Sequence, residues 1–252
     1  MSITRLLIEY DGTRFGGWAR QPSGERSVQG EIEAALGTLL RREISLTVAG
    51  RTDRGVHAWG QVASYVGEPA RLRGLNALLP PDIAALACDQ APDGFDARHA
   101  ALSRTYCYRI LARRTPGAFS QQRMFWWPRG IDFPALEACA VALRGQHDFT
   151  AFTPSGSSYR YFRRTVLDAH WKSYGDELQF WIEADSFLRH MNRILIGTML
   201  EVSSGRRPIE AFIELLAGRT RSDAGVTAPA HGLYLAAVSY PTTAADTIAT
   251  SP

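Results

Sequence analysis

The chain has 252 residues, of which 45% are hydrophobic and 21% are charged, and its formal net charge is +3. This composition supports a packed core and excludes a disordered chain, and no apolar run approaches the roughly 18 residues of a membrane span. The three cysteines (Cys88, Cys107 and Cys139) are odd in number and far apart, which argues against a disulfide framework or a thiolate metal site and favours a cytoplasmic location.

The N-terminal part of the chain predicts strands and helices in the order β-α-β-β-α-β. Alternation of apolar and polar residues predicts strands at 6–10, 44–48, 61–66 and 83–88. Apolar residues three and four positions apart predict a helix over 28–39, and Ser27 is a suitable N-terminal cap for it. A second, short helix is predicted at 71–79, because Pro80 and Pro81 end it.

The C-terminal part repeats this order. The predicted strands are 105–111, 161–171, 177–184 and 233–239, and the predicted helices are 134–143, 187–202 and 208–216. The fold class is therefore predicted as α+β, with two ferredoxin-like halves that each form an antiparallel sheet with helices on one face. We place the halves at 1–96 and 97–241, followed by a flexible tail at 242–252.

Two predicted loops, 115–130 and 153–164, combine arginines with aromatic residues. Such a composition can stack nucleobases and hold phosphates, but surface loops whose aromatic side chains enter the core have the same composition. All 28 basic residues except Lys172 are arginines, whose planar guanidinium suits phosphate recognition. Genomic base composition can produce the same bias, so these features leave nucleic-acid binding open.

The segment VAGRTDRGVHAWGQVASY, residues 48–65, carries the densest set of candidate functional residues. Gly50 and Gly55 are expected to let the chain turn sharply around Arg51 and Asp53, which places a carboxylate at the end of a strand. The tripeptide Arg-Thr-Asp by itself is better explained by a turn-capping aspartate beside a solvated arginine. The longer segment is much more specific.

GRTDRGVHAWGQV resembles the signature of the TruA family of tRNA pseudouridine synthases. Six further segments resemble family blocks in the same order, namely 10–21, 27–36, 75–84, 95–108, 187–202 and 231–241. The resemblance covers about residues 6–241, and ordered blocks over such a length are hard to obtain by accident. The chain is identified as a member of this family.

The resemblance implies an isomerase that breaks the N1–C1′ bond of a uridine, turns the uracil and rejoins it through C5. Asp53 would be the nucleophile, attacking either C1′ of the sugar or C6 of the base. The expected targets are positions 38, 39 and 40 of the tRNA anticodon stem-loop, bound in a cleft between the two halves. The resemblance also implies a homodimer, and no cofactor or metal is expected.

The resemblance assigns roles to four further residues. Arg193, in FLRHMNR, is expected to offset the cost of burying the Asp53 carboxylate, although an exposed helix arginine is the alternative. Arg51 is expected to hold the site that the extracted base leaves. Tyr106 is expected to stack on the uracil, and its hydroxyl is a candidate for moving the C5 proton. Leu235, together with Tyr234, is expected to wall the pocket, with core packing as the alternative for Leu235. The candidates for gripping phosphates are the arginines at 14, 20, 98, 160, 163 and 164.

Three residues depart from the family pattern: Ala19, Arg54 and Asn192. None of them replaces a candidate site residue, so the isomerase activity is still expected. They bear only on which uridines are the targets. Two alternatives from other classes stay open. One is an RNA-binding protein without catalysis, and the other is a hydrolase that uses Asp11 with Asp53 and releases free base or sugar.

Overall fold

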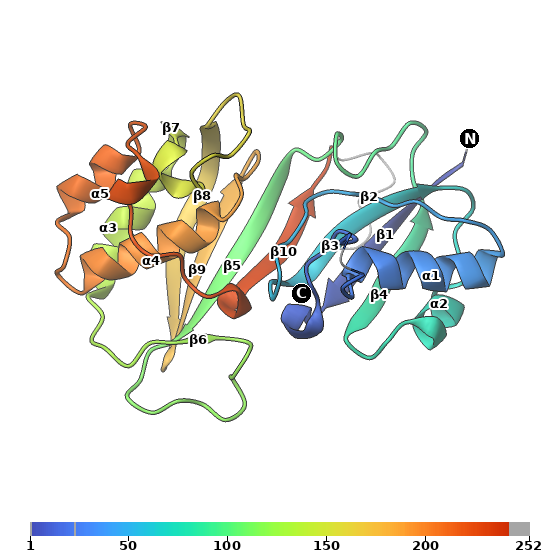
Figure 1. Ribbon diagram of the computed structural model, residues 1–252, viewed down its shortest axis with the longest axis horizontal. Coiled ribbons are helices and arrows are strands. Elements are labelled where there is room, and N and C mark those ends of the chain that lie inside the picture. The colour runs from blue at the N-terminus through green and yellow to red at the C-terminus, as the bar shows by residue number, and fades with distance from the viewer. Residues whose placement is uncertain (1, 23, 242–252) are drawn as a thin grey trace.

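The computed structural model describes residues 2–22 and 24–241, and these form one mixed sheet with helices packed on it (Figure 1). Within the described residues ten strands share this sheet, in the order β4-β1-β3-β10-β5-β9-β8-β7, with β2 paired to β3 and β6 paired to β5. The tail expected at 242–252 lies outside the described residues. No helix in the described part is long and apolar enough to cross a membrane.

The N-terminal half has the predicted element order. Its elements are β1 (Ile3–Tyr10), α1 (Val28–Leu40), β2 (Thr47–Val48), β3 (His57–Val66), α2 (Leu72–Leu78) and β4 (Ile83–Gln90). The Ser27 side chain caps α1 by accepting the N–H of Gly30, as predicted. The strand predicted at 44–48 is wrong over its first three residues, because the N–H of Leu46 bonds to the Glu33 carboxylate of α1 at 3.0 Å.

The C-terminal half repeats the order with additions. Its elements are β5 (Ser103–Leu111), β6 (Phe125–Trp126), α3 (Phe133–Leu143), β7 (Gly145–Asp148), β8 (Arg163–Tyr174), β9 (Glu177–Ala184), α4 (Met191–Ser203), α5 (Ile209–Leu215) and β10 (Leu233–Ser239). The short strands β6 and β7 were not predicted. The helix predicted from residue 187 begins only at Met191, because His190 adopts a left-handed conformation with φ of 61°.

The two halves join through a parallel pair of strands. Each half arranges its strands in the order fourth, first, third, second, and β10 of the second half pairs with β3 of the first. In this seam Tyr234 is opposite His57 and Leu235 is opposite Ala58. β2 pairs only with Ala63 and Ser64 of β3. The first residues of β3, His57 and Ala58, are therefore free to pair with β10. The sheet is antiparallel as predicted except at this seam and between β5 and β6. The division at residue 96 stays a prediction.

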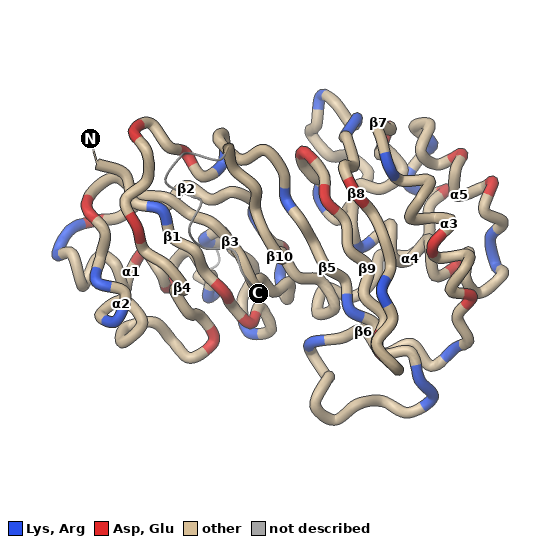
Figure 2. Tube along the Cα trace, turned by 180° about the vertical axis from the view of Figure 1, so that it is seen from behind, with Lys and Arg blue, Asp and Glu red and all other residues tan. Residues whose placement is uncertain are grey.

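The helices of both halves cover the same face of the sheet. Ala58, Leu235 and Tyr106 lie side by side on neighbouring strands and therefore point to one face. All three belong to a single buried apolar cluster that also contains the inward residues of α1 and α4, and both helices lie in front of the sheet in Figure 1. The opposite face carries the alternate residues of these strands, such as Tyr234 and Trp181, and Figure 2 views the molecule from that side.

Candidate active site

Asp53 lies in the loop between β2 and β3 of the N-terminal half, just before the start of β3, which pairs with β10 of the other half. The N–H of Val56 bonds to the carbonyl of Asp53 at 3.1 Å, and Gly55 has φ of 75°, so a sharp turn follows Asp53 as predicted. Gly50, unlike Gly55, does not have a positive φ. A Cβ at Gly50 would instead lie 3.7 Å from the Tyr106 hydroxyl, so Gly50 brings the loop backbone close to Tyr106.

A buried hydrogen-bond network supports the residues just before Asp53. The Tyr10 hydroxyl bonds to Thr52 Oγ1 at 2.7 Å, and burial raises the pKa of Tyr10 to about 12. Gln61 Nε2 donates to the Gly50 carbonyl at 2.7 Å and to the Tyr10 hydroxyl at 3.4 Å. We did not predict these roles, although Tyr10 and Gln61 both belong to family-like segments of the sequence. The network holds the chain before Asp53 with little freedom to move.

Two nitrogen groups from the second half face the Asp53 carboxylate. Asp53 Oδ2 lies 3.9 Å from Arg193 Nη1 and 3.4 Å from His190 Nε2. The Arg193 side chain is only 17% exposed, and its Nε donates to the Ala228 carbonyl at 2.8 Å. The structure therefore brings together Asp53 and Arg193, and the alternative of an exposed helix arginine is wrong. Sequence reasoning missed His190, whose one signal was its place three residues before Arg193.

Burial lowers the pKa of His190 below its ordinary value, and the positive charge of Arg193 lowers it further, while Asp53 acts in the opposite direction. The ring is therefore neutral at pH 7, so Arg193 supplies the positive charge beside Asp53.

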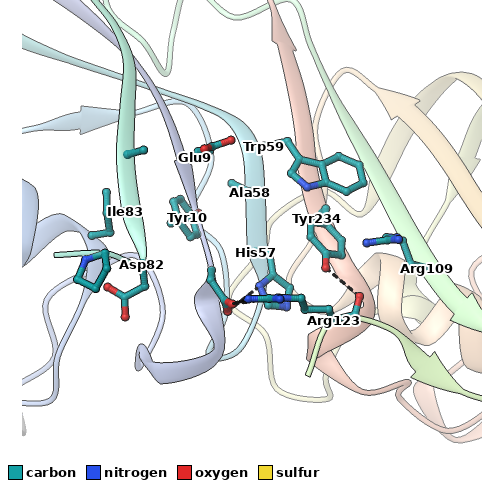
Figure 3. Close-up of a pocket in the computed structure, with 13 residues that line it drawn as sticks. Glu9, Tyr10, His57, Ala58, Trp59, Asp82, Ile83, Arg109, Arg123 and Tyr234 are labelled. Atoms are coloured by element: carbon teal, nitrogen blue, oxygen red, sulfur yellow. Dashed lines mark hydrogen bonds and ion pairs between the residues drawn. The ribbon is translucent and has the colours of Figure 1, made fainter. Parts of the chain in front are cut away.

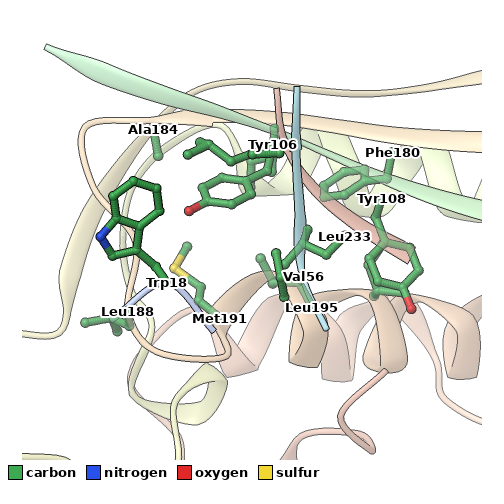
Figure 4. Close-up of a cluster of buried hydrophobic side chains, with 14 of the residues drawn as sticks. Trp18, Val56, Tyr106, Tyr108, Phe180, Ala184, Leu188, Met191, Leu195 and Leu233 are labelled. Atoms are coloured by element: carbon green, nitrogen blue, oxygen red, sulfur yellow. The ribbon is translucent and has the colours of Figure 1, made fainter. Parts of the chain in front are cut away.

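Tyr106 is a residue of β5, and its side chain extends from the sheet toward the loop that holds Asp53. Its ring packs edge-on against Phe187, with ring centroids 4.9 Å apart, and burial raises the pKa of its hydroxyl well above the ordinary value. Figure 4 shows the ring beside Trp18 and above Met191, with the hydroxyl directed toward them. The hydroxyl therefore stays protonated and can donate a hydrogen bond at neutral pH.

Arg51 and Leu235 have contrasting surroundings. Arg51 is exposed, and its side chain makes no hydrogen bond or ion pair within the described part of the chain. Leu235 is fully buried between Ala58 and Tyr106 in the sheet, so it packs in the core, and its contact with a substrate stays a prediction.

All three departures from the family pattern lie in the described part of the chain, and Ala19 packs partly buried against the apolar cluster. Arg54 forms an ion pair with Glu25 at 2.5 Å, so its charge is partly neutralised. Asn192 is buried and its Oδ1 has no hydrogen-bond partner; nothing in the structure explains an amide at this position.

A hollow of about 390 Å³ lies on the other face of the sheet, away from Asp53 (Figure 3). Asp11 lines it, and its carboxylate lies 3.0 Å from Arg123 Nη2 and 3.2 Å from His57 Nδ1. Asp11 is thus engaged on a different face, which disfavours a hydrolase that uses Asp11 with Asp53. The described residues contain no cluster of three or more His, Cys, Asp or Glu side chains that could hold a metal ion.

The family model described as tRNA pseudouridine synthase matches residues 6–92 and 139–241. The chain is 42% identical over 248 residues to the tRNA pseudouridine synthase A of Moorella thermoacetica, covering 95% of this chain and all of the relative. It is 40% identical to the enzyme of the same name from Myxococcus xanthus, with 95% and 92% of the two chains covered. The corresponding values for Roseiflexus sp. are 43% identity and coverage of 94% and 90%.

Proposed function

The chain belongs to the TruA family of tRNA pseudouridine synthases, and from this membership we propose that it isomerises uridine to pseudouridine at positions 38, 39 and 40 of the tRNA anticodon stem-loop. The observation that carries the proposal is the convergence of Asp53, Tyr106 and Arg193. These residues come from three distant segments: Arg193 lies beside Asp53, and the Tyr106 hydroxyl lies beside Gly50 of the same loop, close enough for the Asp53 charge to act on it. They would supply the nucleophilic carboxylate, the stacking ring and the guanidinium that the family resemblance assigns to this reaction.

Asp53 is the proposed nucleophile. Both nitrogen contacts reach its Oδ2, which leaves Oδ1 as the oxygen for attack on C1′ or on C6 of the uridine. Its side chain is 34% exposed, so a substrate can reach it, while Arg193 offsets the cost of partial burial. The N1–C1′ bond breaks, C5 bonds to C1′, and the bond that Asp53 formed to C1′ or C6 breaks again, which returns the free carboxylate. The C5 proton is lost while N1 regains a proton, so the product is an isomer of uridine.

The target uridine must first be extruded from the base-paired anticodon stem. Extruding a stacked and paired base costs a few kcal/mol, and stacking on an aromatic ring returns about 1–3 kcal/mol. Tyr106 is proposed to provide that ring, and exposed Arg51 is proposed to occupy the place that the base leaves. Phosphate contacts from other arginines supply the remaining binding energy. Two of the expected arginines already have acidic partners, since Arg20 lies 2.8 Å from Glu33 and Arg14 lies 3.6 Å from Asp82.

We further propose that the enzyme is a cytoplasmic homodimer. The three cysteines are free and buried, which fits a reducing compartment. The homodimer is proposed because the resemblance to the TruA family implies one. Light scattering on the purified protein measures this directly, and a monomer at micromolar concentration would contradict the dimer.

The decisive experiment treats unmodified tRNA with purified protein in the absence of added metal or nucleotide. Carbodiimide-dependent primer-extension stops map pseudouridine, and we expect stops at positions 38–40. Asp53→Asn is expected to abolish conversion while tRNA binding persists, and Asp93→Asn, at an exposed turn, serves as the matched control.

Each other outcome has a distinct meaning. Full conversion by Asp53→Asn would overturn the nucleophile, and stops only outside 38–40 would overturn the specificity. Released free base would support the hydrolase, and binding without conversion by the wild type would support the RNA-binding protein.

A further inference from the structure

His190 has a backbone conformation that the fold does not require of a histidine. It is the residue before the first turn of α4, with φ of 61° and ψ of 1°, and its side chain makes no capping hydrogen bond to the helix. A residue with a Cβ rarely adopts this left-handed conformation, which glycine adopts freely. Its carbonyl accepts the N–H of Ile194 at 3.0 Å, a contact that any residue could make. The reason for a histidine at this left-handed position must therefore lie in what its side chain contacts.

The imidazole lies against the Asp53 carboxylate, with Nε2 3.4 Å from Oδ2. Among the described residues, the only cation within ion-pair distance of that carboxylate is Arg193, whose Nη1 is 3.9 Å away. Arg193 is held elsewhere, since its Nε donates to Ala228. The charge of Arg193 at 3.9 Å stabilises the carboxylate in almost any orientation. A hydrogen bond from the ring N–H of His190 would instead favour one orientation of the acceptor oxygen. The two residues therefore have separable effects on Asp53.

The charged groups around His190 favour its neutral form. Asp53 faces it from the loop before β3, Arg193 and Arg189 from α4 and the segment before it, and Arg221 from the turn at 221–223. Burial lowers the pKa of His190, the three arginines act in the same direction, and Asp53 alone opposes them. A neutral ring carries one N–H, and a carboxylate beside Nε2 favours the tautomer that places the hydrogen there.

We propose that His190 is a positioning residue for the isomerisation, donating its Nε2 hydrogen to Oδ2 of Asp53 and so turning Oδ1 toward the nucleoside. This inference rests on the proposed function of Asp53. The 3.4 Å separation in the free protein is longer than a hydrogen bond of normal length, and it is expected to shorten when tRNA closes the site. His190 itself does not touch the reacting atoms.

Two substitutions separate this role from a structural one. His190→Gln keeps an amide nitrogen near the place of Nε2, and His190→Gly removes the donor while it relieves the left-handed backbone. Arg41→Gly is the matched control, because Arg41 also has a left-handed backbone, with φ of 53°, at the end of α1. Single-turnover rates and KM for unmodified tRNA are measured together with thermal unfolding.

We expect His190→Gly to lower the single-turnover rate by about 10²-fold, with KM within about twofold and no loss of thermal stability. His190→Gln is expected to recover at least about tenfold of that loss, and Arg41→Gly to react at the wild-type rate. A wild-type rate for His190→Gly would overturn the proposal, as would equal losses in both variants accompanied by raised KM. Absence of conversion by the wild type would instead overturn the proposed function, and the His190 role with it.

Discussion

The ring of Tyr234 stacks on the ring of His57, with centroids 4.6 Å apart and planes inclined by 21°. The two residues are partners in the parallel seam between β10 and β3, so this stack joins the last strand of the fold to the strand that follows the Asp53 loop. His57 Nδ1 accepts the N–H of Gly12 at 3.0 Å, and its Nε2 faces the Gln122 carbonyl at 2.9 Å. A neutral imidazole with its hydrogen on Nε2 satisfies both contacts.

This arrangement predicts that acid destabilises the protein. Burial lowers the pKa of His57 below its ordinary value of 6.5, and Asp11 offsets this only in part. The unfolded chain therefore binds a proton near pH 6.5 while the folded chain does not. The free energy of unfolding accordingly falls as the pH decreases from about 6.5 toward the lower folded pKa. Urea midpoints at pH 7.5, 6.5 and 5.5 measure the decrease.

His190 and His231 contribute in the same direction, so substitution isolates the share of His57. His57→Gln is expected to show a shallower decrease with acid than the wild type, and His99→Gln, at an exposed position, to follow the wild type. Identical pH slopes for His57→Gln and the wild type would show that His57 does not contribute.

Tyr10→Phe is expected to weaken both the fold and the catalytic loop. The substitution removes a hydroxyl that bonds to buried Thr52 and lies within reach of Gln61. Leaving such groups unpaired costs about 1–3 kcal/mol of unfolding free energy, and looser support before Asp53 should lower kcat more than it changes KM. Urea unfolding and steady-state kinetics measure the two effects. Tyr174→Phe, on an exposed tyrosine, is the control, and equal midpoints for the two variants would refute the support role.

Gly12→Ala tests the close approach of the N-terminal segment to the catalytic loop. A Cβ at Gly12 would lie 2.0 Å from the Val56 carbonyl oxygen, and Val56 is hydrogen-bonded to Asp53. The backbone must shift, so we expect a loss of about 1–3 kcal/mol in unfolding free energy and a lower kcat. Gly130→Ala meets open space and should leave both quantities unchanged. A Gly12→Ala enzyme with wild-type kcat would mean that the loop tolerates the shift.

Tyr106→Phe separates stacking from proton transfer. The phenyl ring keeps its contact with Phe187, so tRNA affinity should change little. Loss of the hydroxyl should lower the single-turnover rate by about 10²–10⁴-fold if that group moves the C5 proton. Rates at saturating tRNA and filter-binding affinities distinguish the two effects. A Tyr106→Phe rate equal to that of the wild type would restrict Tyr106 to stacking.

Local pattern was sufficient for most elements. The strand Glu177–Ala184 has the bounds that alternation predicts, because every second residue along its whole length is buried. Leu233–Ser239 also has the predicted bounds, although only its first three residues are buried. The same signal failed at residues 44–46, where Ile44 and Leu46 are buried but the backbone bonds to a helix side chain. Alternation reports which side chains are buried and does not report where the backbone finds its hydrogen bonds.

The sequence by itself determined the element order, the family and the candidates Asp53, Tyr106, Arg51, Arg193 and Leu235, since these depend on residue type at fixed spacing. Only the tertiary structure decided the parallel seam of β10 with β3, the network under Asp53 and the approach of His190 to its carboxylate. Those features join residues up to 177 positions apart, as Tyr234 and His57 are. Contacts between residues so far apart in the sequence depend on how the two halves pack together. The local spacing of apolar residues carries no information about that packing.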